Sequence, residues 1–185
     1  MNGIIVADVK KCLACRTCEI ACAVQHSGYT DLLDALEDNA FLQPRVSVEA
    51  VGDLSMPLQC RHCEDAPCIE VCPTGAIERQ DGEGPVLINE GLCVGCKFCV
   101  LACPFGVLSI GRKGRAAMKC DLCFDRLSHS QSPACVQACP TKALRFVPVG
   151  EFTGEKRKAF ARSLVGGLEN GPGQSRGRTL REQAK

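Results

Sequence analysis

Tryptophan is absent from this sequence, tyrosine occurs once, and aromatic residues together make up only 4% of the chain. A chain of 185 residues normally forms one domain with its own apolar core. Here the aliphatic residues stand in short runs between cysteines. An ordinary packed interior is therefore scarce, and part of the stability must come from another source.

Targeting and membrane segments are also lacking. Residues 1–8 contain no basic stretch, no twin arginine and no apolar run long enough for a signal peptide. No segment approaches the roughly 18 consecutive apolar residues of a membrane span. We expect a soluble protein in the reducing cytoplasm, where abundant cysteines are more often metal ligands than disulfides.

Motifs for substrate chemistry are missing as well. The sequence has no glycine-rich dinucleotide loop, no phosphate-binding P-loop and no nucleophile elbow. We therefore expect no catalytic residues in this chain, and we expect any catalysis to belong to a partner.

Cysteine is what the chain has in excess: sixteen residues form four groups of four, with none left over. The groups are Cys12, Cys15, Cys18, Cys22; Cys60, Cys63, Cys68, Cys72; Cys93, Cys96, Cys99, Cys103; and Cys120, Cys123, Cys135, Cys139. Four thiolates are the ligand count of a [4Fe–4S] cluster, and the third group, C-x2-C-x2-C-x3-C followed by Pro104, is the bacterial ferredoxin run. The sequence predicts that all sixteen cysteines are iron ligands of four [4Fe–4S] clusters, whose binding contributes to folding.

An internal repeat follows these groups. Three of the four end in Cys-Pro, at Pro73, Pro104 and Pro140. Proline stops the short helix that carries the last two cysteines, and an apolar pair then begins a strand. The first group lacks this proline, so its helix can continue. We expect strands at 3–7, 45–51, 76–79, 86–88, 107–110 and 144–148, a hairpin turn at 82–85, helices at 16–25, 66–71, 97–102 and 134–138, and one acidic amphipathic helix within 26–44.

The groups must also pair with one another. In the ferredoxin run the fourth cysteine points away along the following helix and ligates the other cluster of a two-cluster unit. The order and spacing of all four groups, with an x11 gap only in the last, resemble the four-cluster iron–sulfur subunits found beside molybdenum or tungsten oxidoreductases, formate-linked hydrogenases and carbon monoxide dehydrogenase. The resemblance covers about residues 3–148. It implies an α+β fold of two ferredoxin-like two-cluster halves, with small β-hairpins and short helices around four clusters.

The same resemblance implies which cysteines share a cluster, because in that family the first group pairs with the fourth and the second with the third. The implied sets are Cys12, Cys15, Cys18 and Cys139; Cys22, Cys120, Cys123 and Cys135; Cys60, Cys63, Cys68 and Cys103; and Cys72, Cys93, Cys96 and Cys99. One half is thus nested inside the other in the sequence. The missing proline after Cys22 departs from the repeat and leaves the ligand count intact.

Zinc, disulfides and a [3Fe–4S] cluster are the alternatives to four [4Fe–4S] clusters. Paired C-x2-C elements also build zinc sites with four thiolates, but zinc does not explain the x2-x2-x3 spacing followed by proline. A disulfide scaffold is disfavoured in a reducing compartment. One [3Fe–4S] cluster stays open as an alternative, although it usually accompanies a missing cysteine.

A few polar residues near the cysteines could influence a bound cluster. His62 either donates a hydrogen bond to a cluster sulfur or faces solvent. Lys97 and Lys119, next to Cys96 and Cys120, either offset cluster charge or are solvated. For His26 and His129 we expect structural or surface roles.

The C-terminal part has a different character. Residues 1–150 are expected to form the four-cluster domain, and residues 151–169 an amphipathic helix ended by Gly166-Gly167. Residues 170–185 are expected to form a disordered basic tail. Residues 151–185 contain eight Lys or Arg against four Asp or Glu, so a basic segment follows a body that its clusters make electronegative.

These patterns favour an electron-transfer subunit of a cytoplasmic oxidoreductase complex, with a catalytic subunit and a second redox protein as partners. The first choice of catalytic subunit is a molybdenum or tungsten aldehyde or formate oxidoreductase. A free polyferredoxin, or a partner of carbon monoxide dehydrogenase or hydrogenase, is the alternative. The C-terminal helix either folds back on its own domain or docks on a partner, including a second copy in a filament. Nucleic-acid binding through the basic tail is disfavoured because the body is electronegative and lacks an aromatic platform.

Overall fold

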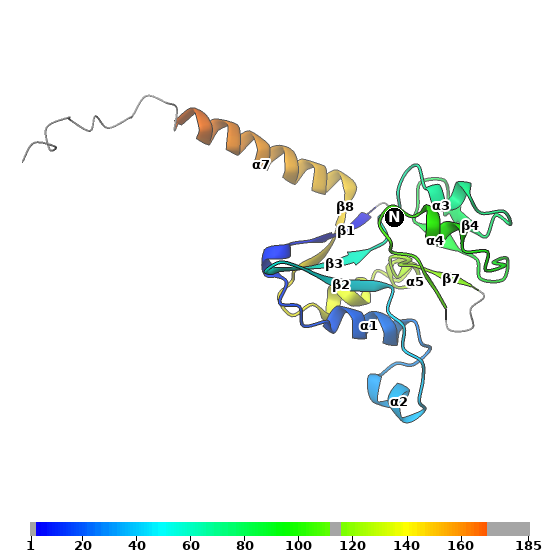
Figure 1. Ribbon diagram of the computed structural model, residues 1–185. Coiled ribbons are helices and arrows are strands. Elements are labelled where there is room, and N and C mark those ends of the chain that lie inside the picture. The colour runs from blue at the N-terminus through cyan, green and yellow to red at the C-terminus, as the bar shows by residue number, and fades with distance from the viewer. Residues whose placement is uncertain (1–2, 112–115, 170–185) are drawn as a thin grey trace, which may run out of the picture. The chain divides into compact units, whose positions relative to one another are not determined.

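The computed structural model describes residues 3–111 and 116–169, and its elements are labelled in Figure 1. The chain divides into two units, Met1–Pro148 and Val149–Lys185. All sixteen cysteines belong to the first unit.

Four separate two-stranded antiparallel ribbons form the strands of the first unit. They pair β1 (Gly3–Ala7) with β8 (Leu144–Pro148), β2 (Val46–Val51) with β3 (Leu54–Gln59), β4 (Ile77–Arg79) with β5 (Val86–Ile88), and β6 (Ser109–Ile110) with β7 (Ala117–Met118). Short helices connect them: η1 (Val9–Lys11), α1 (Thr17–Gln25), α2 (Leu32–Glu37), α3 (Pro67–Glu70), α4 (Phe98–Ala102), α5 (Phe124–Ser128) and α6 (Ala134–Ala138). The predicted α+β class is confirmed.

The Cys-Pro repeat controls where the helices end. Helices α3, α4 and α6 all stop before the Cys-Pro dipeptide, where proline cannot continue a helix. Helix α1, whose last cysteine has no following proline, runs on to Gln25. Both outcomes confirm the sequence prediction.

One half of the unit joins the two ends of its sequence. Strand β1 pairs with β8 in a register that places Ile5 opposite Phe146, and α1 packs against α6. Figure 1 shows these early and late segments side by side. Their shared core contains the apolar side chains of Ile5, Leu127 and Leu144 together with several buried cysteines.

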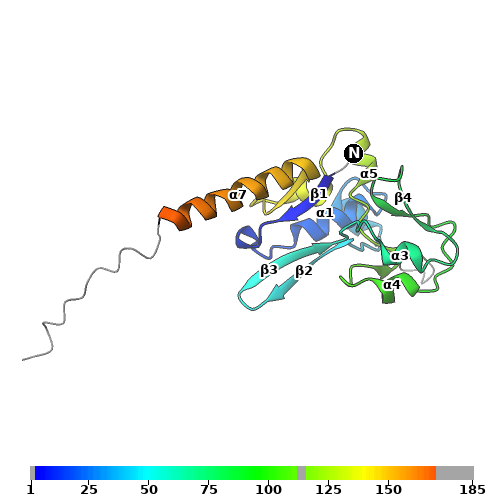
Figure 2. The same ribbon diagram turned by 90° about the horizontal axis from the view of Figure 1, so that it is seen from above.

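The other half lies within the sequence of the first. Helix α3 packs against α4, and the β4–β5 hairpin turns through residues 80–85 as predicted. Its core contains Ile77, Val86 and Leu108, again among cysteines. Figure 2 shows α3 and α4 together, apart from β1 and α1.

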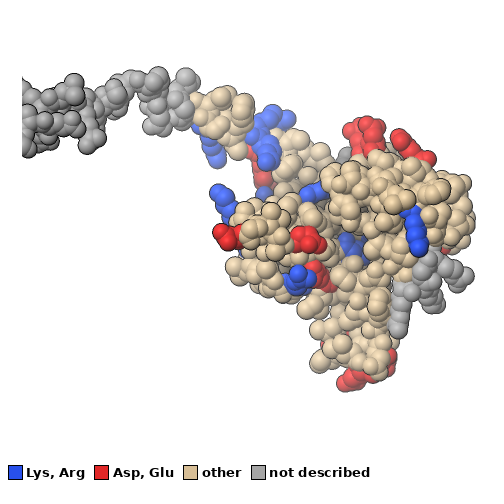
Figure 3. Space-filling view, in the orientation of Figure 1, with Lys and Arg blue, Asp and Glu red and all other residues tan. Residues whose placement is uncertain are grey.

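Four elements were not predicted: η1, β3, β7 and α5. The acidic helix expected within residues 26–44 is present as α2, and Figure 3 shows the acidic side chains gathered over it. Its exposed residues include Leu33 and Leu36.

The second unit is described through helix α7 (Val149–Glu169). The helix ends at Glu169, as predicted, but Gly166-Gly167 do not end it, because it continues through both glycines. Phe160, Leu164 and Val165 are exposed, and the Lys156 ammonium lies 5.5 Å from the centroid of the Phe152 ring. The predicted disordered tail, residues 170–185, lies outside the described residues. Among the helices that the structure describes, none is both long and apolar enough to cross a membrane.

Candidate metal centres

Each of the four groups begins with a C-x2-C loop that has the same unusual backbone. The residue before the second cysteine has a positive φ in every case: 55° at Ala14, 49° at His62, 72° at Gly95 and 60° at Leu122. For the three residues that are not glycine, this left-handed conformation costs about 1–3 kcal/mol. It turns successive backbone N–H groups inward, which forms a concave nest suited to an anionic group.

Backbone N–H groups of these loops donate to cysteine sulfur. The His62 N–H lies 3.4 Å from the Cys60 Sγ, and the Leu122 N–H lies 3.4 Å from the Cys120 Sγ. Such bonds favour thiolates, which are the form that binds metal. The strained loops are therefore shaped to surround a bound, sulfur-ligated group.

Cysteines from the first and fourth groups line one recess. Cys12, Cys15 and Cys18 meet Cys139 around about 310 Å³ of empty space, part of which is open to solvent. Residues more than 100 positions apart meet here because β1 pairs with β8 and α1 packs against α6.

Cysteines from the second and third groups line another recess. Cys60, Cys63 and Cys68 meet Cys103 around about 340 Å³ of empty space, again partly open to solvent. The α3–α4 contact brings them together. In both recesses the fourth cysteine comes from the paired group.

A third set is buried deeply. Cys22, Cys120, Cys123 and Cys135 are all buried, and they influence one another electrostatically. Burial, to which the neighbouring Cys22 and Cys123 add, raises the pKa of Cys135 to about 12. Burial likewise raises the pKa of Cys120 well above its usual value, with Cys135 and Cys22 adding to the effect.

Three of the remaining cysteines, Cys72, Cys93 and Cys99, belong to the inner core or pack against it. Burial raises the pKa of Cys99, and Cys93 and Cys96 add to that rise. None of the cysteines in the described part of the chain is joined to another by a disulfide.

The donor set fits iron–sulfur clusters. Every donor is sulfur, two recesses each bring four donors together, and burial disfavours the charged form of the thiols unless a cationic centre compensates it. Burial raises the pKa of both Cys18 and Cys22 to about 11. Four sulfurs would also satisfy zinc, so the choice of metal rests on the family to which the chain belongs.

A polar network that sequence reasoning missed lies beside the most buried set. The Arg45 backbone N–H donates to the Cys22 Sγ at 3.3 Å, and its guanidinium lies 2.8 Å from Asp121. Asp121 accepts from the Cys123 N–H at 2.8 Å, and the His26 Nε2 lies 3.5 Å from Asp121 and 4.0 Å from the Cys123 Sγ. Ligand atoms of His26, Asp121 and Cys123 all lie within 4.8 Å of one another. No spacing pattern in the sequence marks Arg45 or Asp121.

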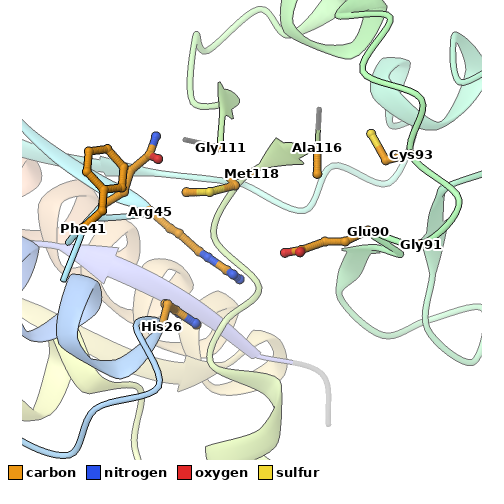
Figure 4. A pocket seen from close by; sticks show the side chains of 10 residues that line it. His26, Phe41, Arg45, Glu90, Gly91, Cys93, Gly111, Ala116 and Met118 are labelled. Atoms are coloured by element: carbon orange, nitrogen blue, oxygen red, sulfur yellow. The ribbon is translucent and has the colours of Figure 1, made fainter. Parts of the chain in front are cut away.

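This network borders a cavity with about 1270 Å³ of empty space, part of which is open to solvent, that reaches toward the inner half. Figure 4 shows the Arg45 and Glu90 side chains extending toward each other across it, with His26 and Met118 nearby. Cys93 also lines the cavity. The network thus lies between cysteines assigned to different halves.

Burial decides between the two interpretations that the sequence left open for His62 and for Lys119. The solvent-facing interpretation of His62 is wrong, because its Nδ1 accepts from the buried Val86 N–H at 3.0 Å and its Nε2 is buried. The solvated interpretation of Lys119 is also wrong, because only 3% of this residue is exposed. Lys97 and His129 are exposed, as a solvated charge and a surface residue should be.

Comparison with known proteins identifies the family. The family described as "4Fe-4S dicluster domain" matches residues 51–149. The "Iron-sulfur protein" of Rhodospirillum rubrum is 45% identical over 176 residues, which cover 89% of this chain and 92% of that protein. The electron transport protein HydN of Escherichia coli K12 is 42% identical, covering 87% and 98% of the two chains. The thiosulfate reductase electron transfer subunit PhsB of Salmonella typhi is 41% identical, covering 77% and 74%.

The chain therefore belongs to the family of 4Fe–4S electron-transfer proteins. Its role is that of an electron-transfer subunit of the oxidoreductase class, without a catalytic role of its own. Iron–sulfur clusters rather than zinc are accordingly its cofactors.

Proposed function

We propose that this chain holds four [4Fe–4S] clusters and conducts single electrons between a catalytic subunit and a second redox protein. The ligand sets are those that the resemblance implies: Cys12, Cys15, Cys18, Cys139; Cys22, Cys120, Cys123, Cys135; Cys60, Cys63, Cys68, Cys103; and Cys72, Cys93, Cys96, Cys99. The observation that carries the proposal is the lining of two recesses, where three cysteines of one group meet the last cysteine of another.

The chain's own residues prepare the path for the electrons. Bound clusters accept and release single electrons without substrate chemistry. The strained loops hold the sulfur ligands, and the two apolar cores exclude water around them. Cys15 and Cys96 are the exposed ligands among the sixteen. Electrons would enter and leave through their clusters, one in each half.

For the catalytic subunit we propose a molybdenum- or tungsten-dependent aldehyde or formate oxidoreductase, in a cytoplasmic complex. Carbon monoxide dehydrogenase or a hydrogenase is the alternative. The similarity to PhsB, named as a subunit of thiosulfate reductase, favours a bound subunit over a free polyferredoxin. HydN is named only as an electron transport protein, which fits either arrangement.

The cofactor content is tested by anaerobic purification and chemical analysis. We expect about 16 iron atoms and about 16 acid-labile sulfides per chain, with reducible clusters visible by electron paramagnetic resonance. Zinc without sulfide would refute the proposal. Identification of the large subunit that co-purifies, and of its metal, tests the proposed partner.

We further propose that α7 docks on α2 of a second copy, so that copies assemble into a longer chain of clusters. Helix α7 exposes Phe160, Leu164 and Val165 and carries four basic residues, while α2 exposes Leu33 and Leu36 among acidic residues. In Figure 3 basic side chains are prominent on α7, which also carries three glutamates, and acidic side chains lie over α2. Apolar side chains and complementary charge on both partners favour such a contact.

Light scattering under anaerobic conditions tests this assembly. The full chain should form particles larger than a monomer, and both removal of residues 149–185 and the double substitution Asp34→Lys with Glu37→Lys should abolish them. Removal of residues 170–185 alone is the control and should leave the particles intact. A full chain that stays monomeric would show instead that α7 serves its own domain or another protein.

A further inference from the structure

His62 lies in the recess of Cys60, Cys63, Cys68 and Cys103, and its tautomer is fixed by one hydrogen bond. The Val86 backbone N–H donates to the His62 Nδ1 at 3.0 Å. A ring nitrogen that accepts a hydrogen bond carries no proton, so the ring is neutral and its proton is on Nε2. His62 therefore presents one N–H donor on the side of the ring away from Val86.

That donor is buried and has no protein acceptor among the described residues. A buried donor left without an acceptor costs about 1–3 kcal/mol. Because nearly all buried polar groups in native proteins are satisfied, the Nε2–H requires an acceptor that the polypeptide itself does not provide. The recess that His62 lines is where such an acceptor would lie.

A buried cation lies close to the same recess. Lys119 donates to the backbone oxygens of Val86 and of Cys120, the latter at 3.1 Å. It forms no ion pair with a carboxylate in the described part of the chain. A buried ammonium needs a compensating negative charge. Val86 thus connects the two side chains: its N–H donates to the His62 ring, and its carbonyl oxygen accepts from the Lys119 ammonium.

We propose that the His62 Nε2–H donates a hydrogen bond to a sulfur of the cluster held by Cys60, Cys63, Cys68 and Cys103, and so raises the reduction potential of that cluster. Reduction adds one electron to the cluster and makes its sulfurs more negative, while no covalent bond forms or breaks. A hydrogen bond to sulfur is therefore stronger in the reduced state. His62 thus favours the reduced state of this cluster, so that an electron on the chain occupies this cluster more often. The inference rests on the proposed ligand sets.

The test is a redox titration of the full, cluster-loaded chain, followed by electron paramagnetic resonance. His62→Phe removes the donor, and the exposed His129→Phe is the matched control. We expect the reduction equilibrium constant of one cluster to fall about tenfold in His62→Phe, which is about 59 mV for one electron. The other clusters, and all clusters of His129→Phe, should keep their potentials. His62→Gln, which retains an N–H donor, should recover part of the loss. Unchanged potentials in a fully loaded His62→Phe variant would overturn the inference.

A second measurement does not depend on assembly of that variant. The chain has three histidines, so replacing His26 and His129 by Phe leaves His62 alone to carry a ¹⁵N-histidine label. Electron–nuclear double resonance of the reduced protein should then detect a weak nitrogen coupling and an exchangeable proton. Absence of both would overturn the inference. Iron and sulfide analysis of the same sample separates this outcome from failure of the proposed function, which would appear as missing clusters.

Discussion

Lys119 and Lys97 each lie next to a cysteine, but Lys119 is buried and Lys97 is exposed. Lys119 directly follows β7 and points into the protein, where its ammonium donates to the backbone oxygens of Val86 and Cys120. Lys97 caps α4 with a left-handed backbone (φ 68°) and is exposed. Only the buried charge acts on its surroundings without strong screening by water.

We predict that Lys119→Met lowers the reduction potentials of clusters on both sides of the residue. The ammonium stabilises the more negative reduced state of the Cys68 and Cys120 clusters, so its loss should shift each potential by about 59 mV or more, equivalent to a tenfold change. Lys97→Met is the matched control and should change little. An anaerobic redox titration measures both variants, and equal effects in the two would contradict a special role for the buried charge.

The candidate ligands could be picked out from the sequence, whereas the polar residues beside them could not. The sixteen cysteines stand out because their spacing alone encodes loops that hold one metal group. His26, Arg45 and Asp121 were missed as a network, because their contacts depend on the folded path of the chain rather than on spacing. For His62 and Lys119, the sequence left two alternatives that only burial could decide.

The turn after each Cys-Pro dipeptide shows how one local element is repeated with different residues. Gly75, Gly106 and Lys142 occupy equivalent positions, with φ of 64°, 62° and 53°. Each donates its backbone N–H to the preceding group's last cysteine oxygen at 3.3 Å. Glycine adopts this conformation freely, whereas lysine does so at a cost.

We predict that Gly75→Ala lowers the free energy of unfolding by about 1 kcal/mol, since alanine resists the left-handed conformation. No atom lies within 4 Å of the added methyl group, so the effect is one of backbone conformation alone. Lys142→Gly should raise the free energy of unfolding, because glycine adopts the left-handed conformation freely. Denaturant-induced loss of cluster absorbance measures both. A destabilised Lys142→Gly variant would indicate that its side chain matters more than its backbone.

Most elements were predictable, including α2 and β2 between the first two cysteine groups, whereas β3, β7, α5 and the short helix η1 were not. Helices that end at Cys-Pro and the strands that follow depend on local rules, and they were confirmed. Strand β3 contains Pro57, which argues against a strand from sequence, and helix α5 lies hidden in the x11 gap of the last group. Helix α7 continues through Gly166-Gly167 because two glycines weaken a helix without necessarily ending it.

At the scale of the whole molecule, one half encloses the other in sequence, and each half has its own core. The β1–β8 pairing closes the outer half across nearly the entire first unit, and the inner half folds from a continuous stretch between its parts. Long-range closure of this kind requires a large loss of chain entropy. Ligands shared between distant cysteine groups would offset that loss, since metal binding adds its free energy to folding.

Cys139→Ala tests whether the first and fourth cysteine groups share ligands of one cluster. Native protein of this variant is treated with a thiol-alkylating reagent under anaerobic conditions, and the modified cysteines are located by mass spectrometry. Because Cys15 is exposed and Cys12 is half-buried, both should react once their cluster is lost. We predict alkylation of Cys12 and Cys15, a loss of about four irons per chain, and continued protection of Cys120, Cys123 and Cys135. Alkylation of Cys120, Cys123 and Cys135 with Cys12 and Cys15 still protected would contradict the account.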